Sequence, residues 1–267
     1  MRPFFLFFLL ISFTSARSQN LISGGKLKPE QSNMDIRHYT LALHIDLDQH
    51  SIDGYTEIDL ILRQPSRTIL LDLVHLMKVD RVWVNGKQTQ FTHDSDLLRI
   101  TSPTELTAGR VNVKVQYAGK PGVAARPPWD GGFTWTTDST GNPWVAITSE
   151  GEGGKIFFPC KDHPSDEPNE GADLIITVPK GLVVAGPGLL QSIKTKKNQS
   201  TFHWKTSYSI NNYSILFNIG KYKVVSRPYT TINGNTVPMQ FYVLEEHANK
   251  GEHQLDLLER TVHMQEK

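Results

Sequence analysis

A strict alternation of apolar and polar residues, beginning at Tyr39, constrains the fold more than any other feature of this sequence. Tyr39, Leu41, Leu43, Ile45 and Leu47 share one parity, and His, Thr and Asp fill most of the positions between them. A period of two over this length is typical of a β-strand with one buried face. We therefore expect residues 39–48 to form such a strand.

Similar patterns recur along most of the chain. Asp53-Gly54 marks a turn, and Asn85-Gly86 follows an apolar run, a combination that favours a two-residue hairpin. Many short strands with no helical period between them predict a mainly β fold, either a β-sandwich or a large twisted sheet. The expected strands cover residues 39–48, 58–62, 68–73, 82–87, 97–101, 111–117, 172–178, 182–185, 201–205, 213–219, 222–225 and 236–244.

Two regions depart from this strand pattern. Apolar residues recur at helical spacing from Glu252 onward, at Leu255, Leu258 and Val262, so a helix is expected there. Residues 120–143 are rich in Pro and Gly and carry three large aromatic residues, which predicts a long loop. The aromatic rings either cap the sheet as local core, which is the favoured interpretation, or form a contact surface.

The stretch 144–168 contains the candidate functional residue. It begins as a short strand, reaches the carboxylate of Glu150, passes through Gly151, Gly153 and Gly154, and enters an apolar run that ends at Cys160. Glycines allow a positive φ or a close backbone approach, so a carboxylate at this bend would be held in place by the buried residues that follow. From composition alone, a solvated Glu in an acidic turn is the simpler interpretation.

Glu150, followed by Phe158-Pro159-Cys160, Asp162 and Pro164, resembles a segment of the zinc aminopeptidases of the aminopeptidase N and leukotriene hydrolase family, the gluzincins. The order of strands over residues 35–267 is similar as well. The resemblance implies that Glu150 binds the free α-amine of a peptide substrate, through a charge-assisted hydrogen bond. Lys155, Lys161 and His163 stand where that family often has other residues.

The resemblance also implies a domain organisation. Residues 34–226 would form the N-terminal β-domain, and residues 227–267 would open an α/β peptidase domain that this chain contains only in part. The His-Glu-x-x-His zinc motif of the family is absent from the sequence. Zinc is therefore expected in the full-length parent, together with the peptidase domain as the partner of Glu150. No catalytic or metal-binding residue is expected here, and the chain alone should be inactive.

The first residues indicate export. Residues 1–16 have one Arg, an apolar run and small residues at the end, which predicts a secretory signal peptide. Residues 17–33 are polar and are expected to be a flexible lead-in. The mature protein would be secreted or periplasmic, without a membrane span. The single cysteine, Cys160, excludes an intrachain disulfide and is expected to be buried and unreactive.

The net charge of +1 and the absence of a basic stripe with aromatics argue against nucleic acid as a partner. Two alternatives to the aminopeptidase interpretation remain. One is a secreted, non-catalytic β-sandwich that binds a glycan or a protein through residues 120–143. The other is a natural relative of the family that has lost the zinc site.

Overall fold

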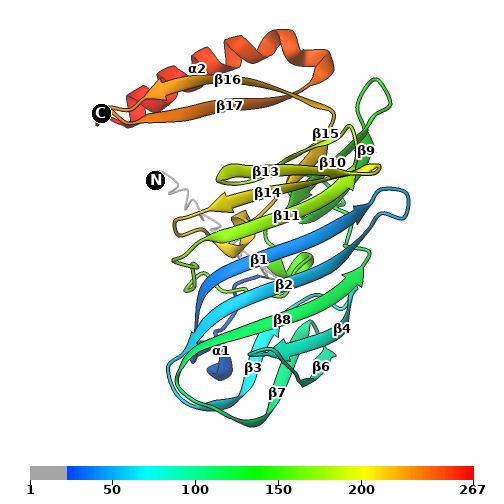
Figure 1. The fold of residues 1–267 in the computed structure, drawn as a ribbon, viewed down its shortest axis with the longest axis vertical. Coiled ribbons are helices and arrows are strands. Elements are labelled where there is room, and N and C mark those ends of the chain that lie inside the picture. The colour runs from blue at the N-terminus through cyan, green and yellow to red at the C-terminus, as the bar shows by residue number, and fades with distance from the viewer. Residues whose placement is uncertain (1–22) are drawn as a thin grey trace, which may run out of the picture.

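The computed structural model describes residues 23–267, most of which form β-strands (Figure 1). The predicted signal peptide, 1–16, and the first part of the predicted lead-in, residues 17–22, lie outside the described residues. The mainly β fold class is confirmed. None of the helices in the described part of the chain is long and apolar enough to cross a bilayer.

The largest sheet is twisted and eight-stranded, and it lies below the C-terminal hairpin and helix in Figure 1. β1 and β11 are parallel neighbours, and the other neighbouring pairs are antiparallel. The strands, in spatial order, are β13 (Leu189–Lys196), β14 (Gln199–Thr206), β11 (Ala172–Pro179), β1 (Met34–Asp46), β2 (Ser51–Leu62), β8 (Gly109–Gly119), β4 (Met77–Val84) and β5 (Lys87–Gln88).

Strand β1 shows why the alternation predicts this sheet. Its odd-numbered apolar residues from Tyr39 to Ile45 are at most 2% exposed, as the pattern predicts. The strand also extends back to Met34, where the buried residues are even-numbered. A bulge between Ile36 and His38 adds one residue and reverses the parity. Met34 and Ile36 therefore face the same core as Tyr39.

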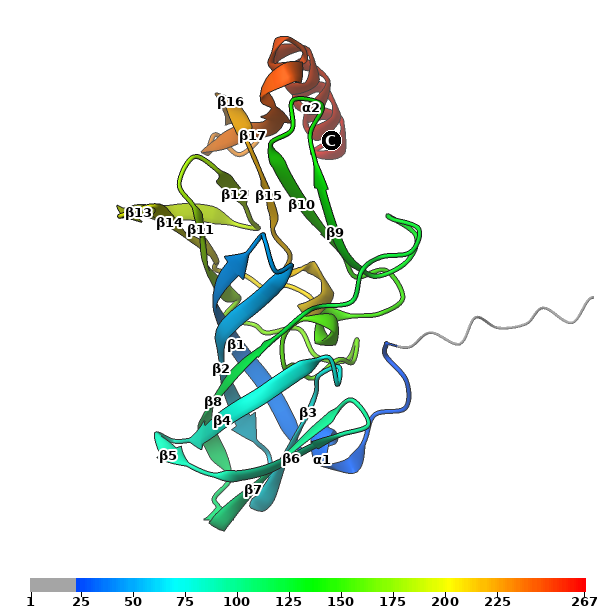
Figure 2. The same cartoon turned by 90° about the vertical axis from the view of Figure 1, so that its right-hand side faces the viewer.

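Two smaller sheets cover the inner face of the large one (Figure 2). One core of apolar side chains, drawn from all three sheets, fills the space between them, so the architecture is a sandwich. The first small sheet contains β3 (Ser66–Asp72), β7 (Leu97–Leu106) and β6 (Gln90–Asp94). The second contains β12 (Val183–Ala185), β15 (Asn218–Gly220), β10 (Pro143–Thr148) and β9 (Gly132–Thr137).

The C-terminal part forms a separate hairpin and helix, at the top of Figure 1. β16 (Tyr222–Thr230) pairs with β17 (Thr236–Leu244), and η3 (Glu245–Lys250) leads into α2 (Gly251–Gln265). The predicted strand 236–244 and the terminal helix are therefore present. Tyr229, Met239 and Leu255 form a small core of their own. The expected boundary between residues 226 and 227 falls inside β16, whereas the break between the sheets lies at Lys221.

Four local expectations are corrected. Asp53-Gly54, expected to be a turn, lies within β2, where the two residues pair with His44 and Leu43 of β1. The expected loop 120–143 contains strand β9, because Phe133 packs among Phe157 and Phe217. The expected strand 213–219 is a 3₁₀ turn, η2 (Asn212–Ser214), followed by the short β15. Within the expected flexible lead-in 17–33, the part 29–33 is ordered: Pro29–Ser32 forms helix α1, and the side chain of Gln31 is buried.

The aromatic residues of 120–143 differ in their environment. Phe133 is fully buried, and Trp135 packs against the main core with its ring stacked on His50. For these two rings the structure agrees with the favoured interpretation as local core. Trp129 does not follow them, because it is 77% exposed.

Gly54 offers a test of the sheet pairing. Its φ is +150°, and a Cβ at this position would lie 2.0 Å from the carbonyl oxygen of Ala42 on β1. At Gly109 φ is +124° but nothing lies within 4 Å of such a Cβ. We expect Gly54→Ala to lower the free energy of unfolding by about 3 kcal/mol or more, and Gly109→Ala by only about 1–2 kcal/mol. Urea unfolding measures both; equal losses would contradict the steric argument.

The turn between β9 and β10 predicts an acid-sensitive contribution to stability. Burial alone would raise the pKa of Asp138, but hydrogen bonds from Asn142 and Thr140 outweigh it and lower the pKa from 3.8 to about 2. A carboxyl whose pKa is lower in the folded state stabilises the fold above its unfolded pKa. That contribution should be lost as the pH falls from 3.8 to about 2. Urea midpoints across this range should show a smaller decline for Asp138→Asn than for the wild type; identical declines would contradict the assignment.

Candidate functional site

Strand β10 delivers the chain to the turn that carries Glu150. Two backbone groups of the turn, the N–H of Glu152 and that of Gly153, donate to the carbonyl oxygen of Ser149 at 3.1 and 2.9 Å. Gly151 and Gly153 have φ values of 69° and 80°, as expected for glycines at this bend. The Ser149 hydroxyl donates to the carbonyl oxygen of Tyr213 at 2.8 Å, which ties the turn to η2.

The residues after the turn are anchored in the main core. η1 (Gly154–Ile156) is followed by Phe157 and Phe158, both fully buried. Their rings meet edge to face with centroids 4.9 Å apart, and Phe158 meets the ring of Tyr39 in the same way at 5.6 Å. Such aromatic contacts add to the stabilisation from burial alone. The anchor that the sequence predicts after Glu150 is therefore present.

A second anchor joins this segment to the end of β3. The N–H groups of Asp72 and Cys160 each donate to the carbonyl oxygen of the other, at 2.7 and 3.1 Å. The Asp72 carboxylate then accepts hydrogen bonds from Gln31 at 2.5 Å and from the N–H of Asp162 at 3.0 Å. Lys28 completes the group with an ion pair at 3.3 Å. Lys28 and Gln31 of the expected lead-in are thus linked through Asp72 to the segment that carries the site.

A third anchor is the buried side chain of Lys161. Its ammonium donates to the carbonyl oxygen of Met34 at 2.6 Å and pairs with Asp166 at 3.2 Å. Asp166 also accepts from the N–H of Ile36 at 3.2 Å. Burial raises the pKa of Asp166, and Lys161 opposes that rise. Both side chains are only 4% exposed, so this pair fixes the segment to the beginning of β1.

Glu150 lies at the edge of a cavity of about 400 Å³. Its carboxylate is exposed, and within residues 23–267 it has no hydrogen-bond or ion-pair partner. The backbone around it is fixed while the charged group stays available, which is the arrangement a ligand-binding carboxylate requires. The remaining lining residues are Ser23, Gly24, Ser149, Gly151, Gly153, Asp162, His163, Pro164, Asn211, Asn212 and Tyr213.

A second carboxylate, Asp162, lies beneath the turn. Its side chain is 2% exposed and pairs with the ammonium of Lys155 at 3.3 Å. Burial raises the pKa of Asp162, and Lys155 acts against that rise. Glu152, two residues beyond Glu150, also has a raised pKa because of burial. Of the two carboxylates that line the cavity, Glu150 and Asp162, only that of Glu150 is exposed, and an exposed carboxylate suits a ligand that carries a cation.

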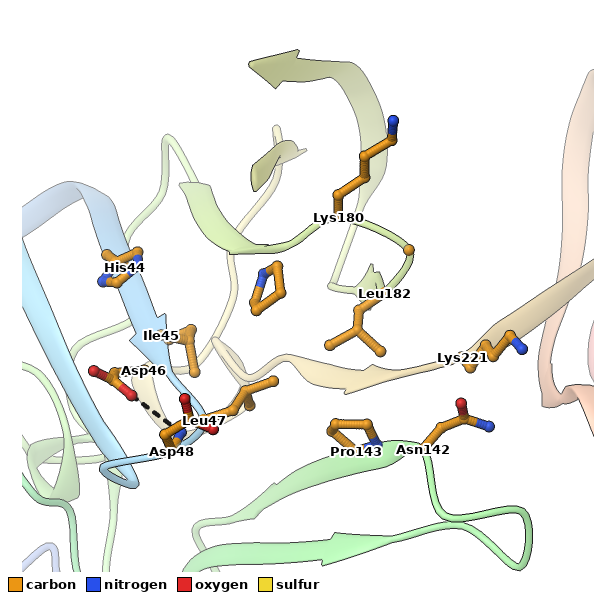
Figure 3. A pocket seen from close by; sticks show the side chains of 12 residues that line it. His44, Ile45, Asp46, Leu47, Asp48, Asn142, Pro143, Lys180, Leu182 and Lys221 are labelled. Carbon is orange, nitrogen blue, oxygen red and sulfur yellow. Dashed lines mark hydrogen bonds between the residues drawn. The ribbon is translucent and has the colours of Figure 1, made fainter. Parts of the chain in front are cut away.

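Another cavity, of about 580 Å³, lies where several strand ends and turns meet (Figure 3). Leu47, Leu182 and Pro143 face its interior, whereas Lys180 and Lys221 point outward. Lys221 is already paired with Glu245 at 3.1 Å. Polar groups do not converge on one point in this cavity, so we do not assign the functional site to it.

Among residues 23–267, no cluster of three or more His, Cys, Asp or Glu side chains is placed to bind a metal ion. His247, Glu252 and His253 are exposed at the beginning of the terminal helix. The side chains of residues 23–267 therefore do not form a zinc site.

Sequence reasoning identified Glu150 and its apolar anchor but missed the buried polar anchors. Asp72 and Gln31 come from distant parts of the chain, and no local pattern marks them. One signal was present: Lys161, Asp162 and Asp166 interrupt or follow an apolar run, where charges are expected only if paired. The structure brings all three together with β1, β3 and the turn.

The fold and the anchored turn define a mainly β sandwich domain that presents one exposed carboxylate beside a cavity. The chain belongs to the Peptidase M1 N-terminal domain family, whose profile matches residues 36–213. Endoplasmic reticulum aminopeptidase 1 from Homo sapiens is 22% identical over 236 residues, and that from Mus musculus is 21% identical. Each alignment covers 82% of this chain and 24% of the relative.

Solved structures agree on the fold. A two-domain M1 zinc metallopeptidase variant bound to L-arginine superposes with a TM-score of 0.70 at 23% identity, covering 80% of this chain and 49% of that one. A Deinococcus radiodurans M1 zinc metallopeptidase variant bound to a Tyr-Ser-Ala substrate gives a TM-score of 0.68 at 22% identity, with the same coverage. This chain thus spans about a quarter of the curated relatives and about half of these structures.

Cys160 gives a direct test of the anchored segment. Its thiol is fully buried, and burial raises its pKa well above the ordinary value, with the carboxylates of Asp162 and Asp72 acting in the same direction. A buried thiol with a raised pKa is a poor nucleophile. We expect the folded protein not to react with a chromogenic disulfide reagent, and the urea-unfolded protein to release one equivalent. Rapid reaction of the folded protein would contradict the burial of this segment.

Proposed function

We propose that this chain is the substrate-recognising N-terminal domain of an exported zinc aminopeptidase, and that Glu150 binds the free α-ammonium group of a peptide. The observation that carries the proposal is the exposed carboxylate of Glu150, which has no partner among residues 23–267 and lies at the edge of a cavity, on a turn closed by two backbone hydrogen bonds. Membership of the M1 family supports it, as do the aminopeptidase names of the curated relatives.

The chemistry of an exopeptidase explains why such a carboxylate is needed. An aminopeptidase must position the bond after the first residue, and the positively charged chain end is the feature that all its substrates share. A carboxylate forms a short, charge-assisted hydrogen bond with an ammonium group. If that carboxylate is held by the backbone, it fixes the distance from the chain end to the scissile bond.

Zinc and catalysis would then reside in the rest of the full-length protein. Zinc would supply Lewis-acid chemistry there, while the residues of this chain would only hold the substrate's amine. The peptidase domain would face Glu150 across the bound peptide. An extracytoplasmic location, secreted or periplasmic, is part of the proposal and is supported by the apolar leader in residues 1–16.

The role of Glu150 can be tested on the chain as it stands. We expect a free-amine dipeptide amide, titrated into ¹⁵N-labelled protein, to shift the amide resonances of residues 149–153, with a dissociation constant in the millimolar range. Glu150→Gln keeps the shape but removes the charge, so the affinity should fall by about tenfold or more. The N-acetylated dipeptide, which lacks the ammonium, should bind no better to the wild type than to the variant.

Glu152→Gln is the matched control, because Glu152 lies on the same turn but does not line the cavity. It should bind the free-amine dipeptide as the wild type does. If Glu150→Gln retains wild-type affinity, or if both variants lose it equally, Glu150 does not recognise the amine.

A further inference from the structure

The pose of Glu150 depends on what lies beneath its turn, because the exposed carboxylate has no partner of its own in the described residues. Gly153 lies directly against the side chain of Asp162. A Cβ added to Gly153 would be 2.1 Å from the Oδ1 atom of Asp162 and 2.5 Å from its Oδ2 atom. The buried carboxylate therefore sets how far the turn can move toward the core.

Asp162 is itself fixed from three directions. Its N–H donates to the carboxylate of Asp72, and its side chain pairs with Lys155. Through Asp72 it is linked to Gln31, and through its neighbour Lys161 to the backbone of β1 at Met34. These contacts fix the backbone of Asp162, and burial and the Lys155 ion pair restrain its carboxylate, so the side chain can support the backbone of Gly153 that rests on it.

We propose that Asp162 is a positioning residue for the amine site, acting on Glu150 through the backbone of Gly153 without binding the ligand ammonium itself. This inference rests on the proposed function of Glu150. Two observations separate the roles of the carboxylates that line the cavity. The Glu150 side chain is exposed and has no partner in the part of the chain that the structure describes, whereas the Asp162 side chain is 2% exposed and pairs with Lys155.

The proposed role of Asp162 depends on the volume of its side chain and not on its charge. Two substitutions can separate these two properties. Asp162→Asn keeps the volume under Gly153 and removes the charge, whereas Asp162→Ala removes the contact. We expect Asp162→Ala to weaken binding of the free-amine dipeptide amide by about tenfold, the lower end of what supporting residues cost at other sites. Asp162→Asn should retain most of the affinity.

Native-state hydrogen exchange distinguishes positioning from general destabilisation. In Asp162→Ala, the amides of Glu152 and Gly153 should exchange about tenfold faster, while those of the β1 core, such as Leu41, keep their protection relative to global unfolding. If turn and core amides accelerate equally, Asp162 is merely structural. If exchange and affinity stay at wild-type values, the inference fails. If Asp162→Asn loses affinity while the turn stays protected, Asp162 contacts the ammonium directly and the inference is also wrong.

A second variant tests the same contact from the other side, should Asp162→Ala fail to fold. Gly153→Ala forces the turn away from Asp162, while Gly141→Ala has nearly the same φ, +85° against +80°, and meets nothing within 4 Å. We expect Gly153→Ala, but not Gly141→Ala, to lose binding and turn protection. The exchange measurements need no ligand. They therefore test Asp162 even if the Glu150 titration shows that the proposed function is wrong.

Discussion

The rest of the candidate site depends on the hydrogen bonds that the carboxylate of Asp72 accepts. This carboxylate lies at the end of β3 and accepts hydrogen bonds from Gln31 and from the backbone of Asp162, residues separated from it by 41 and 90 positions in sequence. The same residue exchanges two backbone hydrogen bonds with Cys160. Because Asp72 is part of a strand in the main sandwich, its hydrogen bonds fix the segment that carries Glu150 to that core.

The buried ion pairs around Asp72 are better explained by positioning than by stability. Removing a lysine and a carboxylate from water costs much of what their attraction returns, and apolar side chains of similar size often stabilise a protein as well or better. The pairs Lys155–Asp162 and Lys161–Asp166 nevertheless replace such side chains. What they provide is geometry: each ion pair, unlike an apolar contact, has only a few acceptable arrangements. That property suits a segment that must present one exposed carboxylate.

The parts of the fold that depend on local sequence patterns could be predicted from the sequence. The alternation in β1, the Asn85-Gly86 hairpin and the helical spacing after Glu252 each reflect interactions within a few residues. The failures have physical causes of longer range. Strand β9 was expected to be loop because residues 120–143 are rich in Pro and Gly, whereas Phe133 of this strand packs against distant phenylalanines in the core. The turn at Asn212 exists because its buried amide donates to the carbonyl oxygen of Lys161.

For the candidate site, the sequence and the resemblance indicated Glu150, but not what holds it. Single polar side chains make the hydrogen bonds that join residues 28–31 to Asp72 and Lys161 to Met34. No periodic sequence pattern therefore predicts these contacts. The expectation of a flexible lead-in up to residue 33 failed for the same reason. A polar composition predicts exposure, yet Gln31 is 2% exposed because Asp72 provides its partner.

The position of the site within the molecule also separates it from the C-terminal hairpin. β16, β17 and α2 have their own small core and contact the sandwich through aromatic groups, such as the hydrogen bond from Trp144 to Tyr222 and the ring contact between Trp204 and Tyr242. The anchors of Glu150 all lie in the sandwich or in residues 23–32. A change in how the hairpin rests on the sandwich would therefore move α2 without moving the carboxylate. The geometry of the turn that carries Glu150 is a property of the β-domain itself.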